Sequence, residues 1–97
     1  MTDKLKKIDL DALFQAILTL ESMEECYAFF EDLCTVPELK ALSQRIQVAH
    51  MLNQQMVYND IVQKTGASTA TISRVNRSLH YGSDGYKLAF SRLESKE

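Results

Sequence analysis

The sequence contains few of the residues that form tight turns or disulfide scaffolds. Its 97 residues include three glycines, one proline and two cysteines. A β-sandwich or barrel needs many tight turns, so this scarcity argues against both. The two cysteines, Cys26 and Cys34, are too few for a disulfide framework and lie among apolar residues. We therefore expect them to be reduced, buried thiols, as in a cytoplasmic protein.

Long apolar runs are also absent. No stretch approaches the ~20 apolar residues that a membrane-spanning helix needs. The lysines among residues 1–8 are not followed by the apolar region of a secretory signal. The length is that of one domain, residues 1–97, with a modest core. We therefore expect a single-domain cytoplasmic protein without a membrane partner.

Charge is unevenly distributed, although the formal net charge is only −2. Residues 9–38 contain eight acidic residues and no basic one, whereas residues 40–80 contain five basic residues and one acid. Because a surface field acts over a Debye length of only ~8 Å, the second region can bind a polyanion although the whole chain is acidic. The other interpretation is a pair of solvated faces without a charged partner.

Apolar residues recur at helical spacing through most of the chain, and no segment alternates with a period of two. The pattern predicts an all-α protein of six helices. Ser22 with Glu25, and again Thr35 with Glu38, have the spacing of a capping box that starts a helix. Ser83 is expected to cap the last helix. The predicted helices run over about 10–18, from the Ser22 cap to about 34, from the Thr35 cap to about 52, and over 58–65, 68–79 and 83–94.

Residues 57–80 have the pattern of a helix-turn-helix. Gly66 falls in the turn, which needs a residue that can adopt positive φ. On the second helix, Ile72, Val75 and Leu79 have the spacing of apolar anchors. The opposite face is polar and small, as a helix that approaches DNA closely requires. The other interpretation is an ordinary helix hairpin.

The polar face supplies the candidate DNA contacts. Hydroxyl groups near the start of a helix can donate to phosphates or to base edges, and arginine and lysine can bind the phosphate backbone. The predicted DNA-binding residues are Lys64, Ser68, Thr69, Ala70, Thr71, Ser73, Arg74 and Arg77.

The run from Gly66 to Arg74 resembles the turn and the start of the recognition helix of the Trp repressor family. Two further stretches, Ala41–Ile46 and Asn76–Leu79, extend the resemblance, which is strongest over residues 37–79 and closest to the YerC/YecD type of Trp-repressor-like protein. The resemblance implies an all-helical, intertwined homodimer. It also implies a bacterial, cytoplasmic DNA-binding transcription regulator that acts as a repressor.

In this family two regions have separate tasks. The resemblance implies that helices at about 9–52 and 83–94 form the dimer. It implies that the helix-turn-helix, at about 57–80, projects from the dimer to read the major groove. The apolar stripes of the first region agree, because a monomer of this length does not easily bury so much apolar surface.

The resemblance also implies an effector cleft. In the Trp repressor, two arginines enclose the indole of the co-repressor, and a glycine leaves room for it. The matching arginines are Arg45 and Arg74, with Thr71 and Ser78 at further pocket positions, while Val75 replaces the glycine. The methyl groups of Val75 are predicted to fill the space of the indole, so tryptophan is not expected to act here. The other interpretation is that the two arginines contact phosphate or pair with carboxylates.

No constellation typical of an enzyme or of a metal site is present. His50 and His80 are thirty residues apart and have no paired acids. No serine lies in a nucleophile elbow, and no glycine-rich loop can bind phosphate. We therefore expect no catalytic residue, metal or cofactor. The alternative to a DNA-binding regulator is a helical protein-interaction module that uses the acidic N-terminal half.

Overall fold

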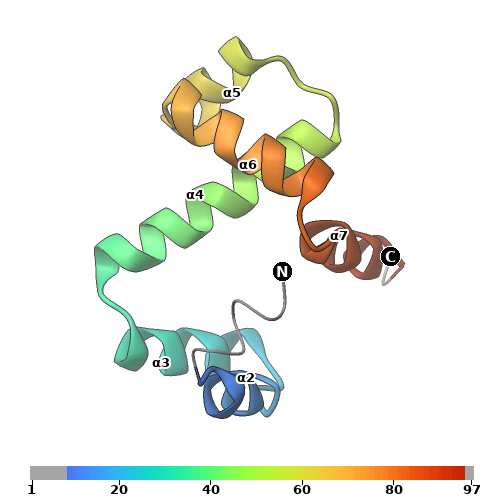
Figure 1. The fold of residues 1–97 in the computed structure, drawn as a ribbon. Coiled ribbons are helices and arrows are strands. Elements are labelled where there is room, and N and C mark those ends of the chain that lie inside the picture. The colour runs from blue at the N-terminus through green and yellow to red at the C-terminus, as the bar shows by residue number, and fades with distance from the viewer. Residues whose placement is uncertain (1–8, 96–97) are drawn as a thin grey trace. The chain divides into compact units, whose positions relative to one another are not determined.

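The computed structural model describes residues 9–95. This part of the chain forms six α-helices and no strand (Figure 1), so the all-α, six-helix prediction is confirmed. None of the described helices is both long and apolar enough to cross a membrane. The helices are α2 (Asp11–Ile17), α3 (Met23–Leu33), α4 (Val36–Asn53), α5 (Tyr58–Thr65), α6 (Thr69–Tyr81) and α7 (Gly85–Ser95).

The chain divides into two compact units, of which the first ends at Leu39 and the second begins at Lys40. The first unit contains α2, α3 and the first residues of α4. Neither α2 nor α3 contains a buried residue. Apolar side chains of these helices are half-buried or exposed in the single chain, with Phe14 exposed at 47% and Tyr27 at 71%. The described part of the first unit therefore has no core of its own.

The two cysteines lie at the apolar side of α3. Both thiols are free, as predicted, but both are only half-buried. The expectation that Cys26 and Cys34 are buried is therefore wrong for the single chain. The physical reason is that the described residues of this unit form no core into which the α3 side chains could be packed.

Side-chain caps start α3 and α4, as the sequence predicts. The Ser22 hydroxyl accepts from the Glu25 amide at 3.1 Å. At the start of α4 the exchange is reciprocal. The Thr35 amide donates to the Glu38 carboxylate at 2.8 Å, and the Glu38 amide donates to the Thr35 hydroxyl at 3.3 Å. The backbone bond from Thr35, followed by the bond from its hydroxyl, lowers the pKa of Glu38 from its ordinary value.

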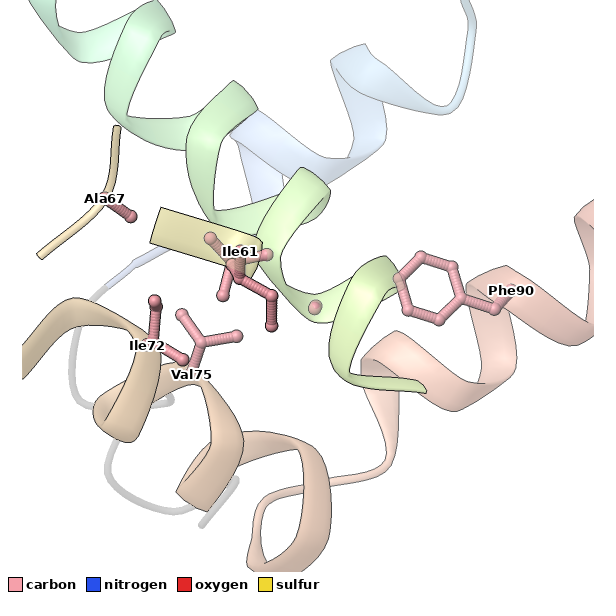
Figure 2. Close-up of a cluster of buried hydrophobic side chains, with 7 residues drawn as sticks. Ile61, Ala67, Ile72, Val75 and Phe90 are labelled. Atoms are coloured by element: carbon pink, nitrogen blue, oxygen red, sulfur yellow. The ribbon is translucent and has the colours of Figure 1, made fainter. Parts of the chain in front are cut away.

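The second unit has a compact apolar core. Ile61 and Ile72 are completely buried in it, and Figure 2 shows Ile72 and Val75 of α6 facing Ile61 of α5. Each fully buried aliphatic side chain of this size contributes ~1.5–3 kcal/mol relative to an exposed one. Four helices and the turn between α5 and α6 therefore converge on one cluster. Its members are Val48, Ala49, Ile61, Ala67, Ile72, Val75 and Phe90.

The last two helices differ from the prediction at their ends. Helix α6 continues to Tyr81 instead of ending near Leu79. Helix α7 begins at Gly85, so the prediction that Ser83 caps it is wrong. The reason is that Asp84 has a left-handed backbone with φ of 63°, and that the Leu88 amide makes its bond to the Asp84 carbonyl. Ser83 therefore lies in the loop, one residue too early to act as the cap.

Candidate nucleic-acid interface and effector cleft

The turn between α5 and α6 has the backbone that the sequence predicts. Gly66 ends α5 in the left-handed conformation, with φ of 73°, and its amide donates to the Val62 carbonyl at 2.8 Å. A residue with a Cβ is disfavoured in this region of φ. An added Cβ at Gly66 would meet no atom within 4 Å, so lack of space does not explain the glycine. The positive φ of the backbone is the reason that glycine is favoured at this position.

Side-chain bonds hold the rest of the turn. The Thr65 hydroxyl donates to the Ile61 carbonyl at 2.7 Å and accepts from the Ala67 amide at 3.1 Å. The Ser68 hydroxyl accepts from the Thr71 amide at 3.1 Å and so caps α6. The short turn therefore has little freedom, and it fixes the direction in which α6 begins.

Helix α6 separates an anchored face from a solvent face. The predicted anchors Ile72, Val75 and Leu79 are all buried, which confirms the prediction for this face. Figure 1 shows α5 and α6 side by side. Of the candidate DNA-binding residues, Thr71 is half-buried. The others are exposed: Lys64, Ser68, Thr69, Ala70, Ser73, Arg74 and Arg77.

The charge around α6 suits an anionic partner. The first turn of the helix carries no acidic side chain, so the positive end of the helix dipole is not neutralised there. Arg74 and Arg77 are exposed on the same helix. Residues 40–95 as a whole contain seven basic and three acidic residues. The unit that carries the helix-turn-helix pattern is therefore locally cationic.

A hydrogen bond ties α4 to the end of α5. The Gln44 side-chain amide donates to the Thr65 carbonyl at 3.2 Å, in a partly buried position. Gln44 precedes Arg45, so this bond also fixes the part of α4 from which Arg45 extends. This role of Gln44 could not be predicted from the sequence, because it depends on which carbonyl faces the side chain after folding.

A cavity of about 430 Å³ lies between α4, α6 and α7. The structure brings all of the predicted cleft residues to this cavity, although they are far apart in the sequence. The predicted residues in its lining are Arg45, Thr71, Arg74, Val75 and Ser78. Their role in binding an effector stays a prediction.

Three more residues line the cavity: Ala41, Gln44 and Tyr86. Ala41 precedes Arg45 by four residues, so helical periodicity places both on one face of α4 and could have identified it. Tyr86 could not be identified in this way. Its place depends on the loop between α6 and α7, and the left-handed Asp84 in this loop has no clear signal in the sequence.

Val75 lies at the boundary between the core and the cleft. Its side chain is 3% exposed and belongs to the core cluster, where Figure 2 shows it beside Ile72. The residue therefore belongs to the core and lines the cleft at the same time, because helical spacing places Val75 on the anchored face of α6, next to the cavity. That its methyl groups fill the space of an indole stays a prediction. That tryptophan does not act as co-repressor stays a prediction.

The fold and the cleft define a class of small all-helical proteins in which two helices and a glycine turn are held on a longer helix. The family described as Trp repressor protein matches residues 8–94. The chain belongs to this family, as the sequence motifs predict.

Similar proteins are found in several bacteria. YerC of Bacillus subtilis (strain 168), a protein of uncharacterized function, is 53% identical over 95 residues, which are 98% of this chain and 91% of YerC. A TrpR-like protein from Eubacterium eligens has a solved structure that is 59% identical, with a TM-score of 0.90 over 95% of both chains. A candidate Trp repressor from Staphylococcus aureus is 56% identical, with a TM-score of 0.89 over 93% of both chains.

Proposed function

We propose that the protein is a sequence-specific DNA-binding transcription regulator, acting as a repressor in the bacterial cytoplasm. The observation that carries this proposal is the solvent face of α6. This face is polar and cationic, while the opposite face is anchored by three buried residues. Such a helix can enter the major groove without losing its own packing. Membership of the Trp repressor family supports the proposal.

The roles follow from position along α6. Thr69 and Ala70 lie at the start of the helix, where short side chains let the backbone approach base edges. Ser73 supplies a hydroxyl group for phosphates or bases, and Arg77 binds the phosphate backbone. The Ser68 hydroxyl, which donates to Thr71, holds the cap of the helix at this interface. Sequence preference therefore comes from the first turns of α6, and most of the electrostatic affinity comes from its arginines.

We also propose that the regulator is a homodimer. The support lies in α2 and α3, which bury no residue in the single chain and expose Phe14, Tyr27 and Leu33. A second copy would cover such surfaces, and obligate interfaces of this kind commonly exceed ~2,000 Å². A dimer would present two copies of α6 to successive major grooves, which lie ~34 Å apart.

Selection of genomic DNA fragments with the purified protein tests the proposal. The enriched site should bind in a salt-dependent manner, with a log–log slope of about −0.9 for each phosphate neutralised. Arg77→Ala should reduce the magnitude of this slope. Lys87→Ala, which removes an exposed cation from α7, is the matched control and should leave the slope nearly unchanged.

Failure to enrich any sequence, together with no binding to duplex DNA at low salt, would contradict the proposal. That result favours the alternative of a helical protein-interaction module. In that case the acidic residues 9–38 become the surface to test for a protein partner.

A further inference from the structure

The lining of the cleft is rich in hydrogen-bond donors. Only Ala41 and Val75 among its lining residues are apolar, and none is acidic. The polar members are Gln44, Arg45, Thr71, Arg74, Ser78 and Tyr86, which include two cations. Such a lining suits an anion with several oxygen acceptors, whereas a mainly aromatic ligand needs more apolar surface.

Several of these donors are free to bind a ligand. The Thr71 hydroxyl accepts from the Ser68 hydroxyl at 3.1 Å and keeps its own proton to donate. Gln44 uses one of its two amide hydrogens for the Thr65 carbonyl and retains the other. Arg45 and Arg74 are both exposed, so each guanidinium can turn toward a bound group without first leaving a core.

A phosphate group matches this set better than a carboxylate does. A carboxylate offers two oxygens in one plane, which one guanidinium already satisfies through a bidentate pair. A phosphate is tetrahedral. A DNA phosphodiester offers two charged oxygens that point in different directions, and a free phosphate ester offers three, so a second guanidinium and a hydroxyl donor can also reach the group. A cavity of about 430 Å³ is larger than a phosphate and leaves room for the atoms bonded to it.

We propose that the cleft binds a phosphate group between Arg45 and Arg74. In the regulator proposed above, this group is a backbone phosphate of the DNA, because Arg74 also belongs to the solvent face of α6. This choice of source rests on the proposed function. A free phosphate ester has the same chemistry and is the other source that the experiment distinguishes. In the DNA case, Arg45 on α4 extends the DNA contact beyond the helix-turn-helix.

The first measurement uses inorganic phosphate alone. Amide chemical shifts of the full chain are followed by NMR as phosphate replaces chloride at constant ionic strength. We expect saturable shifts at Ser78 and Tyr86 in the wild type. Arg45→Gln should weaken this binding about tenfold or more, because a bidentate charged pair is lost. Lys40→Gln, which removes an exposed cation from the same helix outside the cavity, should change it less than about twofold.

The second measurement uses duplex DNA selected with the same protein. If a DNA phosphate occupies the cleft, Arg45→Gln should reduce the magnitude of the log–log salt slope by about 0.9 per chain. Inorganic phosphate should then compete with DNA for the wild type but not for Arg45→Gln. Arg45→Lys, which keeps the charge but loses the bidentate geometry, should lie between the two. The dispersion of the amide NMR spectrum of each variant shows whether it is folded.

The outcomes separate the sources. Saturable phosphate binding without a change of the salt slope assigns the cleft to a free phosphate ester. A reduced slope with competition assigns it to DNA. If the wild type shows no saturable phosphate binding and Arg45→Gln has the salt slope of Lys40→Gln, the proposal is overturned. If the wild type binds no DNA at all, the proposed function fails, while the phosphate titration still decides the chemistry of the cleft.

Discussion

Both units of the chain have helices with a periodic apolar face, but only the second unit buries such faces in a core of its own. Residues 9–39 contain eight acidic residues and no basic one, and α2 and α3 bury none of their side chains. Residues 40–95 carry an excess of basic residues and bury a cluster to which four helices contribute. Periodicity therefore predicts which face of a helix is apolar, but it does not tell whether the same chain covers that face.

This difference in burial is consistent with different roles for the two units in the proposed regulator. The second unit can hold its helices in place with its own core, so it can present a defined surface to DNA. The first unit exposes apolar side chains that a second copy of the chain would cover in the proposed homodimer. The effect of a substitution on the free energy of unfolding should therefore depend on protein concentration in the first unit and not in the second.

The largest effect is expected in the first unit. Phe14→Asp should lower the stability of the dimer by ~4 kcal/mol, because burial of an aromatic side chain is lost and a charge is placed in the interface. Gln15→Asp is the matched control, since it adds the same charge at an adjacent exposed residue. Sedimentation equilibrium and the concentration dependence of unfolding measure the effect. A wild-type monomer at micromolar concentration would refute the dimer.

The next effect belongs to the core of the second unit. Val75→Gly should cost ~3 kcal/mol, because it removes a buried side chain and places glycine within α6. This loss should appear in urea unfolding at every protein concentration.

The same residue also tests the effector. Calorimetric titration with tryptophan should detect no binding to the wild type, because the cleft has a mostly polar lining and Val75 borders it. Val75→Gly enlarges the space between Arg45 and Arg74 and is the matched comparison. Micromolar binding of tryptophan to the wild type would contradict this expectation and would indicate that the cleft binds tryptophan as it does in the Trp repressor.

A smaller effect is expected for single contacts with DNA. Thr69→Ala and Ala70→Lys should change the preferred sequence by ~1–3 kcal/mol for each affected base pair. Arg77→Ala should instead weaken binding to all sequences alike. Competition binding with single-base variants of the selected site measures both. If all three variants bind like the wild type, α6 is not the reading helix.

The smallest effect concerns the cap of α4. The lowered pKa of Glu38 means that its bond to Thr35 stabilises the folded state above the pKa of the unfolded chain. This contribution is lost as the pH falls through the lower pKa of the folded state. The pH dependence of unfolding in mild acid should therefore be shallower for Glu38→Gln. Identical profiles for the variant and the wild type would exclude a role for this carboxylate.

Local signals predicted most of the fold. Gly66, Ser68 and the Thr35 cap depend on neighbouring residues only, and each lies where the sequence places it. The cleft residues Arg45 and Arg74 were found through the family resemblance, since nothing in their spacing brings α4 and α6 together. Prediction was weakest where burial depends on the path of a loop, as at Tyr86, and for the apolar side chains of α2 and α3, which the single chain does not bury.

Two features of the sequence predict different surroundings for the side chain of Val75. Helical spacing assigns it to the anchored face with Ile72 and Leu79, whereas the replaced glycine assigns it to the cleft. In the structure both assignments hold, because Val75 belongs to the core cluster and also lines the cleft. A residue at the boundary between a core and a cleft can contribute to both.

The place of Tyr86 has a consequence for spectroscopy. Its ring stacks on Phe90, with centroids 6.1 Å apart, and the residue lines the cleft. The chain has four tyrosines and no tryptophan, so its intrinsic emission is that of tyrosine alone. A molecule that enters the cleft changes the solvent around one of only four emitters, and added indole can be excited without background from the protein. The protein thus carries a built-in fluorophore at the cleft, and occupancy can be followed without any label.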